Sequence, residues 1–186
     1  VLKQLMDNSS NDVVSLKFES YVPASHLEYL FNVTGLKERM YSHALGEEWP
    51  SIGDLVLQGK NLVIFQQSHA DEYPWLHGAW GHTWETSYEL EDENDMDCKV
   101  DRGDGEQPVW ILNHFLKSEF GTPDPIKSEW ANDYETIVQR VLDCWEEVGN
   151  RPTFFAVDFW EEGELVNATI TLNQMGHWAD EVPEHP

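Results

Sequence analysis

The stretch DVVSLKFES, residues 12–20, alternates apolar and polar side chains with the period of a β-strand. Ser15, Lys17 and Glu19 fall on one face, and the apolar residues 14, 16 and 18 fall on the other. In a sheet of parallel strands, the apolar face meets the helices that cover the sheet. An open sheet covered on both faces would bury the polar row, whereas a barrel can turn it toward its interior near the functional mouth. The stretch therefore favours a β/α barrel.

A second strand-like stretch, TFFAVDFWEEG at residues 153–163, points to the same kind of interior. We predict a buried strand at 154–160, with apolar side chains on one side and Ala156 and Asp158 on the other. An ionised carboxylate in apolar surroundings is costly unless a positive or hydrogen-bonding group meets it. We therefore expect a specific partner for Asp158. An ion pair with Lys17 or with another interior cation is the purely structural interpretation.

The other segments complete an alternating pattern of strands and helices. Strands are predicted at residues 61–67 and 109–115, with a weaker candidate at 84–90. Helices are predicted at residues 25–31, 51–58, 128–149 and 165–174. The helix at 128–149 carries an apolar stripe, with Ser128 placed to cap its start and Gly149 its end. Alternation of this kind indicates a parallel sheet covered by helices.

These segments supply about five strand–helix units, whereas a complete barrel of eight units needs roughly 250 residues. The predicted fold is α/β: the C-terminal portion of a distorted (β/α)8 TIM-type barrel with parallel strands, whose first strands are missing from this chain. Residues 1–176 are assigned to the partial barrel and residues 177–186 to a C-terminal tail. Because a partial barrel exposes sheet edges, we expect an N-terminal segment or a second chain to complete it.

The balance of charge limits the possible partners. The chain has 186 residues, with 35 acidic against 11 basic side chains and a formal charge of −24. This excess of negative charge argues against nucleic acid as a partner. No apolar run approaches the ~18 residues that span a bilayer, so no transmembrane segment is predicted.

The glycosylation acceptor sites and the cysteines indicate in which compartment the protein is found. Three Asn-x-Ser/Thr acceptors, at Asn8, Asn32 and Asn167, favour export through a glycosylating pathway and therefore a secreted, extracellular glycoprotein. The two cysteines fit an oxidising compartment if they pair. Two reduced thiols in the core are the alternative, because two cysteines alone define no disulfide framework.

Four stretches in succession resemble one family. They are DVVSLKFESYV, GLKERMYSHALGEEWPSIGDLVLQGKNLVIF, WILNHFL and NRPTFFAVDFWEEGELVNATITLN. Together they resemble the later part of the phosphatidylinositol-specific phospholipase C-like phosphodiesterases, in particular the secreted members with one catalytic X-type barrel. The resemblance runs from about Val1 to Asn173. The ordered succession of motifs makes it more specific than any single motif.

The resemblance implies a distorted barrel that cleaves a phosphodiester, with a phosphoinositide or a related head group as substrate. In that family, a general-base histidine takes the proton of the inositol 2-hydroxyl, which attacks phosphorus and forms a cyclic phosphate. A second histidine protonates the leaving glycerol oxygen, and an arginine stabilises the charged transition state. These three residues belong to the first strands and their loops, so the catalytic histidines are expected in a missing N-terminal segment. The resemblance implies no cofactor and no metal.

Several site residues carry over by position. Asp158 matches the catalytic aspartate that orients a histidine. The chemistry agrees, because a carboxylate beside an imidazole fixes its tautomer and stabilises the imidazolium that forms during proton transfer. Lys17 matches a basic residue on the substrate side, and Glu19 lies in the same row. Glu85 and Tyr88 are matched to the substrate pocket.

Histidines of this chain offer two further candidates. His114, at the end of a predicted strand, either touches substrate or is a core histidine bonded to the backbone. The second candidate is a metal site formed by His69, His77, His82 and Asp71. The spacing of these four residues fits no known ligand pattern. Their Trp-rich surroundings favour a packed loop or a rim that contacts sugar or lipid.

The topology of a β/α barrel predicts how the cysteines pair. Cys98 lies in the connection before the strand at 109–115, and Cys144 lies in the last turns of the helix at 128–149. In such a barrel both positions lie at the face opposite the catalytic one, and therefore opposite Asp158. We predict a disulfide between Cys98 and Cys144.

Two functions are consistent with the sequence. The first is an enzyme, in which this chain is the larger piece of a secreted phosphoric diester hydrolase or lyase. The second is a non-catalytic secreted glycoprotein that uses the barrel as a binding or structural scaffold. A pair of catalytic histidines in the missing segment distinguishes the two.

Overall fold

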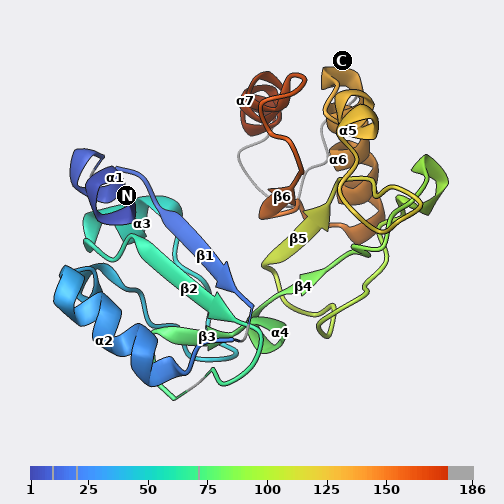
Figure 1. The fold of residues 1–186 in the computed structure, drawn as a ribbon. Coiled ribbons are helices and arrows are strands. Elements are labelled where there is room, and N and C mark those ends of the chain that lie inside the picture. Colours follow the sequence, from blue (N-terminus) through green and yellow to red (C-terminus); the bar gives the residue numbers. More distant parts are fainter. Residues whose placement is uncertain (10, 20, 71, 176–186) are drawn as a thin grey trace. The chain divides into compact units, whose positions relative to one another are not determined.

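The computed structural model describes residues 1–9, 11–19, 21–70 and 72–175. The chain divides into two compact units, Val1–His82 and Thr83–Pro186. Each unit contains a sheet of three parallel strands (Figure 1). The prediction of an α/β fold with parallel strands is confirmed. The predicted tail, residues 177–186, lies outside the described residues.

The first unit is built on a sheet with the strand order β1-β2-β3. Its strands are β1 (Val14–Phe18), β2 (Leu62–Gln66) and β3 (Leu76–Gly78). Its helices are α1 (Leu2–Asn8), α2 (Ala24–Thr34), the short 3-10 turn η1 (Lys37–Arg39), α3 (Ile52–Leu57) and α4 (Ala79–His82). The alternation predicted for β1 is present, since its apolar side chains are half-buried and its polar ones exposed. The central strand β2 is buried throughout, as expected for a strand covered on both faces.

Helices α1 and α2 supply the cover of this sheet. Phe31 of α2 and Met6 of α1 pack into one core cluster with Ile64 and Leu76 of the sheet. Helix α2 ends at Gly35, whose φ of 72° is the left-handed conformation that glycine adopts most easily at a helix end. The apolar face of β1 packs against the same cluster.

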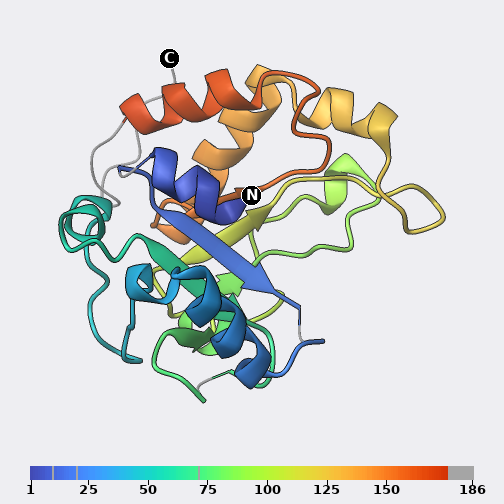
Figure 2. The ribbon, with the colours of Figure 1, turned by 60° about the vertical axis from the view of Figure 1, so that its left-hand side comes forward.

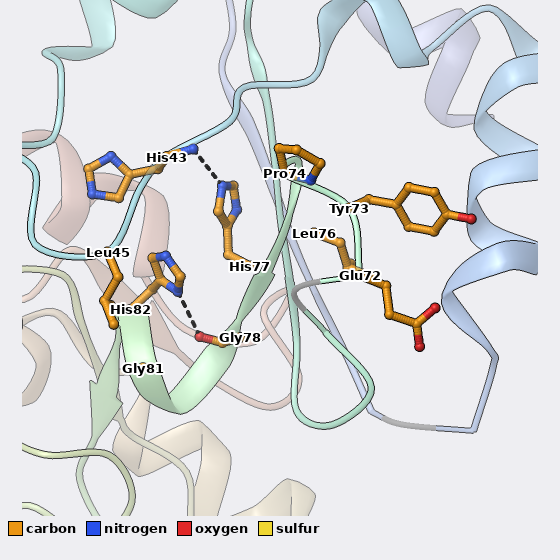
Figure 3. Close-up of a pocket in the computed structure, with 10 residues that line it drawn as sticks. All are labelled: His43, Leu45, Glu72, Tyr73, Pro74, Leu76, His77, Gly78, Gly81 and His82. Atoms are coloured by element: carbon orange, nitrogen blue, oxygen red, sulfur yellow. Dashed lines mark hydrogen bonds between the residues drawn. The ribbon is translucent and has the colours of Figure 1, made fainter.

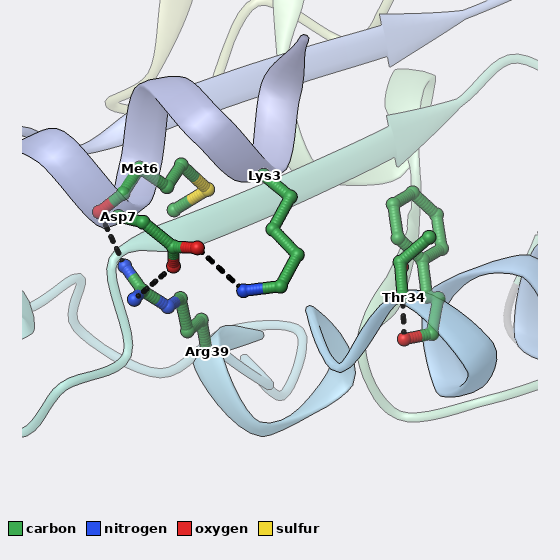
Figure 4. Close-up of polar contacts among 6 residues, drawn as sticks. Lys3, Met6, Asp7, Thr34 and Arg39 are labelled. Atoms are coloured by element: carbon green, nitrogen blue, oxygen red, sulfur yellow. Dashed lines mark hydrogen bonds and ion pairs between the residues drawn. The ribbon is translucent and has the colours of Figure 1, made fainter.

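Charged contacts fasten α1 to η1 (Figure 4). The guanidinium of Arg39 donates to the main-chain carbonyl of Met6 at 2.7 Å and to the carboxylate of Asp7 at 2.9 Å. The ammonium of Lys3 donates to the other oxygen of Asp7 at 2.6 Å. This bond lowers the pKa of Asp7 below its ordinary value. Because these groups are partly exposed, the pairs fix geometry more than they add stability.

The second unit is built on a sheet with the strand order β4-β5-β6. Its strands are β4 (Trp84–Glu85), β5 (Trp110–Asn113) and β6 (Phe154–Ala156). Its helices are the 3-10 turn η2 (Glu93–Asp95), α5 (Pro125–Ala131), α6 (Tyr134–Val148) and α7 (Leu165–Met175). Helices α6 and α7 lie side by side (Figure 2).

Stacked aromatic rings form the centre of this unit. The indole rings of Trp84 and Trp110 are parallel within 2° with centroids 4.5 Å apart. Trp145 of α6 is fully buried in the same cluster. Each indole of the stacked pair also finds an acceptor for its N–H, in the carbonyls of Gln107 and Asn150. Buried tryptophan is stable here because the polar N–H is satisfied.

The single helix predicted at 128–149 is wrong, because the chain forms two helices there. Asp124 caps α5 through the N–H groups of residues 126 and 127, and Asp133 caps α6 through the N–H of Glu135. Short polar side chains compete for backbone groups and so begin new helices. Ser128 therefore lies inside α5 and is not its cap, while Gly149 does end α6 in the left-handed conformation.

The predicted strands exist, but most are shorter than expected. The strand at 154–160 ends at Ala156, and Asp158 lies two residues beyond it in a half-buried position, not within a buried strand. The candidate at 84–90 is a strand only at Trp84 and Glu85. The short strand β3 was missed, because its Trp-rich sequence predicts a loop and only pairing with β2 defines it.

The structure contains the predicted disulfide. Cys98 and Cys144 are joined with their Cα atoms 5.3 Å apart, and no free cysteine is left in the chain. Both residues belong to the buried cluster of the second unit. The bond links the long connection between β4 and β5 to helix α6, so it closes a loop that contains β5 and α5.

We expect this disulfide to stabilise the fold by about 4 kcal/mol, because a closed loop of this length restricts the unfolded chain. The double variant Cys98→Ala, Cys144→Ala should lose that amount in urea unfolding. Thiol labelling of the denatured, unreduced protein should find no reactive thiol. Two reactive thiols, or an unchanged urea midpoint in the double variant, would contradict the expectation.

Candidate functional site

The carboxyl ends of the strands gather the predicted site residues of the second unit. Because β4, β5 and β6 are parallel, their carboxyl ends lie at one edge of the sheet, which is where α/β proteins place their ligands. Glu85 is the last residue of β4, His114 follows β5, and Asp158 follows β6. Three predicted site residues from distant parts of the sequence therefore share one edge.

The carboxylate of Asp158 is half-buried at this edge. Burial raises the pKa of its carboxyl group above the ordinary value, and the charge of Lys117 acts in the opposite direction. No ion pair or hydrogen bond to this carboxylate occurs among the described residues of the second unit. Its main-chain carbonyl, in contrast, accepts a hydrogen bond from the side chain of Asn132. Within the described part of its unit, Asp158 is thus held through its backbone.

Two cations surround Tyr88. The guanidinium of Arg102 lies over the Tyr88 ring at 4.1 Å from the centroid, and the ammonium of Lys117 lies 4.9 Å from it. Arg102 also forms an ion pair with the buried carboxylate of Glu85, and Lys117 pairs with Glu89 at 2.8 Å. The predicted pocket residues Glu85 and Tyr88 therefore belong to one charged cluster. The sequence did not predict that Arg102 and Lys117, the two cations of this cluster, belong to the site. Arg102 lies in the sequence RGD, which is short enough to arise by chance and so gave no signal.

His114 is a core residue. It is fully buried, and one ring nitrogen, Nε2, lies 2.7 Å from the carbonyl of Ala131, to which it donates. Its ring packs against Phe155 with centroids 4.7 Å apart. Burial lowers the pKa of His114 to about 4. This is the arrangement of a core histidine bonded to the backbone, and the side chain is closed off from solvent.

Lys17 and Glu19 lie in the first unit, at and just beyond the carboxyl end of β1. Both side chains are exposed. The ammonium of Lys17 lies over the ring of Trp80 at 4.3 Å from the centroid. A cation on an aromatic face keeps its charge while its position is restricted. Trp80 follows β3, so the contact joins the carboxyl ends of two strands of this sheet.

The first unit also has a pocket of about 440 Å³ beside β3 (Figure 3). It is lined by His43, Leu45, Glu72, Tyr73, Pro74, Leu76, His77, Gly78, Gly81 and His82. Three of these are buried histidines. Trp49 stacks on His43, with ring centroids 3.8 Å apart. The histidine side of the pocket is therefore part of an aromatic cluster.

The hydrogen bonds define the state of these histidines. The main-chain N–H of His43 donates to Nε2 of His77 at 3.0 Å, so the ring proton of His77 is on Nδ1. That Nδ1 donates to the main-chain carbonyl of Ile64 at 2.8 Å. His77 is therefore neutral and occupied on both sides. In His82, Nδ1 donates to the carbonyl of Gly78 at 3.0 Å. Burial lowers the pKa of His43 below its ordinary value, and the neighbouring His82 lowers it further.

The structure does not assemble the metal site considered from sequence. Within residues 1–9, 11–19, 21–70 and 72–175, no group of three His, Cys, Asp or Glu side chains could hold a metal ion. Asp71 lies outside the described residues. His77 and His82 do lie close, with ring centroids 5.1 Å apart. Both direct a ring nitrogen at a main-chain carbonyl, which is the behaviour of packed histidines.

The predicted glycosylation acceptors lie on the surface. Asn8, Asn32 and Asn167 are all exposed, and each belongs to a helix. Their glycosylation remains a prediction. No helix among the described residues is long and apolar enough to cross a membrane.

Comparison with known proteins assigns the family. The family model described as PI-PLC X 1 matches residues 1–173, nearly the whole described chain. This chain belongs to the PI-PLC X family. The resemblance found in its sequence motifs is therefore confirmed.

Two curated proteins are similar to this PI-PLC X chain. A PI-PLC X domain-containing protein 1 of Arthroderma benhamiae is 30% identical over 190 residues, covering 92% of this chain and 62% of the relative. A PI-PLC X domain-containing protein of Arabidopsis thaliana is 24% identical over 188 residues, covering 94% of this chain and 42% of the relative. The chain thus spans less than two thirds of the length of either relative. No solved structure matches it.

The buried state of His114 in this PI-PLC X chain predicts a pH-dependent stability. The unfolded chain binds a proton at His114 below a pH of about 6.5, whereas the folded chain does so only near its pKa of about 4. Stability should therefore fall by about 3 kcal/mol as the pH drops across this window. His114→Gln, which keeps an N–H donor for Ala131, should flatten this part of the curve in urea titrations.

The exposed His26 gives the matched control, because His26→Gln removes a histidine without opening the core. Equal slopes of stability against pH for the wild type and His114→Gln would contradict the buried, neutral state of His114.

Proposed function

We propose that this chain is the later part of a secreted barrel that cleaves phosphodiesters in the manner of phosphatidylinositol-specific phospholipase C. Its catalytic histidines are supplied by a segment that precedes the matched region. The PI-PLC X match over residues 1–173 supports the substrate class. The shorter coverage of this chain relative to both relatives supports the existence of a further segment.

The observation that carries the proposal is the state of Asp158. It lies just past the carboxyl end of β6, with its main chain fixed and its carboxylate without a hydrogen-bond partner among the described residues of its unit. A half-buried carboxylate with a raised pKa is unfavourable for the isolated unit. Such a group is expected where an imidazole from elsewhere completes it.

The proposed chemistry is a proton relay between two histidines. One histidine accepts the proton of the substrate hydroxyl as its oxygen attacks phosphorus, and the bond from phosphorus to the leaving oxygen breaks. The second histidine gives its proton to that leaving oxygen, so the charges balance. Asp158 accepts the N–H of one imidazole, which fixes its tautomer and stabilises the imidazolium.

Within each unit, taken by itself, we assign charged groups to contacts with a phosphate or a head group. Lys17, restricted by Trp80, offers a positive charge to a phosphate or to head-group hydroxyls. In the second unit, Tyr88 is held between Arg102 and Lys117, whose charges Glu85 and Glu89 balance when no anion is bound. An incoming phosphodiester can take up hydrogen bonds from these cations. Glu19 is proposed to accept a head-group hydroxyl.

Two features support a secreted protein. The disulfide between Cys98 and Cys144 is of the kind that persists in oxidising compartments. The acceptors Asn8, Asn32 and Asn167 are exposed and so accessible to glycosylation.

Asp158→Asn in the full-length protein tests the enzymatic role. We expect turnover of phosphatidylinositol in mixed micelles to fall by roughly 10³- to 10⁴-fold, because an asparagine does not stabilise the imidazolium. Glu161→Gln is the matched control, since it removes an exposed carboxylate from the same loop. Unchanged cleavage by Asp158→Asn would contradict the assigned role. No cleavage by the wild type would instead favour the non-catalytic scaffold.

In this chain alone, without the segment proposed to supply the imidazole, Asp158→Asn should raise stability. Because burial raises the pKa of Asp158, its ionised form destabilises the folded state at neutral pH. Asp158→Asn should therefore raise the urea midpoint at pH 7. The gain should disappear below a pH of about 3.9, where the carboxyl is protonated in the unfolded chain as well. A lower midpoint at pH 7 in this chain alone would contradict the expectation, because it would mean that Asp158 already has a stabilising partner within the chain.

The sheet edges predict a completing segment. Strand β1 is an edge strand of its sheet and offers backbone groups to a further strand. We propose that the first strands of the barrel, on the order of 100 residues, are supplied by an N-terminal segment or a second chain. Native mass spectrometry of the purified protein should show this extra mass. A native mass equal to this chain alone, with one cooperative unfolding transition, would refute the partial barrel.

A further inference from the structure

The junction between α5 and α6 forms hydrogen bonds with the main chain just after β6. Asn132, at this junction, is 1% exposed, although its side chain is polar. Its side-chain amide donates to the main-chain carbonyl of Asp158 at 2.9 Å and to that of Phe159 at 3.1 Å. Both acceptors are carbonyl oxygens, so the amide must present its NH₂ group to them. Asn132 therefore holds two consecutive peptide units.

The same residue also closes the far end of the loop. The main-chain carbonyl of Asn132 accepts the N–H of Glu164 at 2.8 Å, directly before α7 begins. Inside the loop, the N–H of Glu162 donates to the carbonyl of Phe159 at 2.8 Å. One buried asparagine thus fixes both ends of the segment 158–164.

The backbone of this segment is constrained as well. Phe159 has a φ of 50°, in the left-handed region that a bulky side chain rarely enters. Gly163 has a φ of 78°, and a Cβ there would lie 2.3 Å from the main-chain oxygen of Asn132. Only glycine fits so close to the junction. A strained turn of this kind persists only when contacts with its surroundings hold it in place. Here Asn132 supplies those contacts.

We propose that Asn132 is a positioning residue for Asp158, an inference that rests on the proposed function. Among the described residues of its unit, no hydrogen bond sets the direction of the Asp158 carboxylate, so its position follows from its main chain. That main chain is held by the amide of Asn132 at the start of a strained turn. These two hydrogen bonds keep the carboxylate of Asp158 at the edge of the sheet where the proposed catalytic imidazole binds it.

The kinetic test uses Asn132→Ala in the full-length protein with phosphatidylinositol as substrate. We expect kcat to fall by about 10- to 100-fold, because a displacement of about 1 Å is enough for such a loss. KM should stay close to that of the wild type, since Asn132 does not touch substrate. In the Asp158→Asn background, Asn132→Ala should cost little more, because its effect acts through that carboxylate.

Two matched controls separate positioning from general destabilisation. Asn61 is also buried, and its side-chain amide also donates to a main-chain carbonyl, that of Asp12 at 2.8 Å. Asn61→Ala removes a comparable bond far along the sequence and should leave kcat unchanged in the folded fraction. Hydrogen–deuterium exchange should rise at residues 158–164 in Asn132→Ala but not in Asn61→Ala.

A second variant covers the case in which Asn132→Ala does not fold. Gly163→Ala disturbs the same turn from its other side and should lower kcat in the same way. Gly149→Ala is its control, because Gly149 has nearly the same φ, 76°, while an added Cβ would meet nothing within 4 Å. It should leave kcat unchanged.

The outcomes separate the two proposals. An active wild type with full kcat in Asn132→Ala and Gly163→Ala overturns the positioning role and leaves the proposed function standing. Losses that multiply with that of Asp158→Asn also overturn it, because they show a route independent of the carboxylate. A wild type that cleaves no phosphodiester overturns the proposed function and this inference together.

Discussion

Parallel pairing of the strands is the constraint on which the rest of the structure depends. Each unit has a central strand, β2 or β5, with a parallel neighbour on each side. Because parallel strands run in one direction, everything that follows them along the chain emerges at one edge. Asp158, Glu85 and the cations around Tyr88 are consequences of this arrangement in the second unit, and Lys17 with Trp80 is the corresponding pair in the first.

Much of the fold could be predicted from the sequence, because burial leaves a periodic signal. The alternation at residues 12–20 marks β1, and the continuous apolar run at 61–67 marks the fully buried β2. The cysteine pairing followed from the order of strand and helix alone. The two strand signals each lie within a single element and need no information about its neighbours.

The parts that sequence reasoning missed depend on contacts between distant residues. The break between α5 and α6 has a local cause, since Asp133 caps a new helix. Its purpose becomes visible only when Asn132 meets the carbonyls after β6. Strand β3 forms because it pairs with β2. Arg102 belongs to the candidate site because it forms an ion pair with Glu85. An apolar stripe extended through Trp130 hid the break, although that side chain is partly exposed.

The disulfide between Cys98 and Cys144 affects what happens when the chain is cut by a protease. The turn between Ser118 and Thr122 carries the exposed Phe120 and lies inside the loop that Cys98 and Cys144 close. Exposed turns of this kind are preferred sites of cleavage by proteases. A cut there separates the polypeptide into two pieces, one ending with β5 and one beginning with α5, but the sulfur–sulfur bond still joins them. In a compartment rich in proteases, this chain can therefore be nicked and yet stay whole until a reductant arrives.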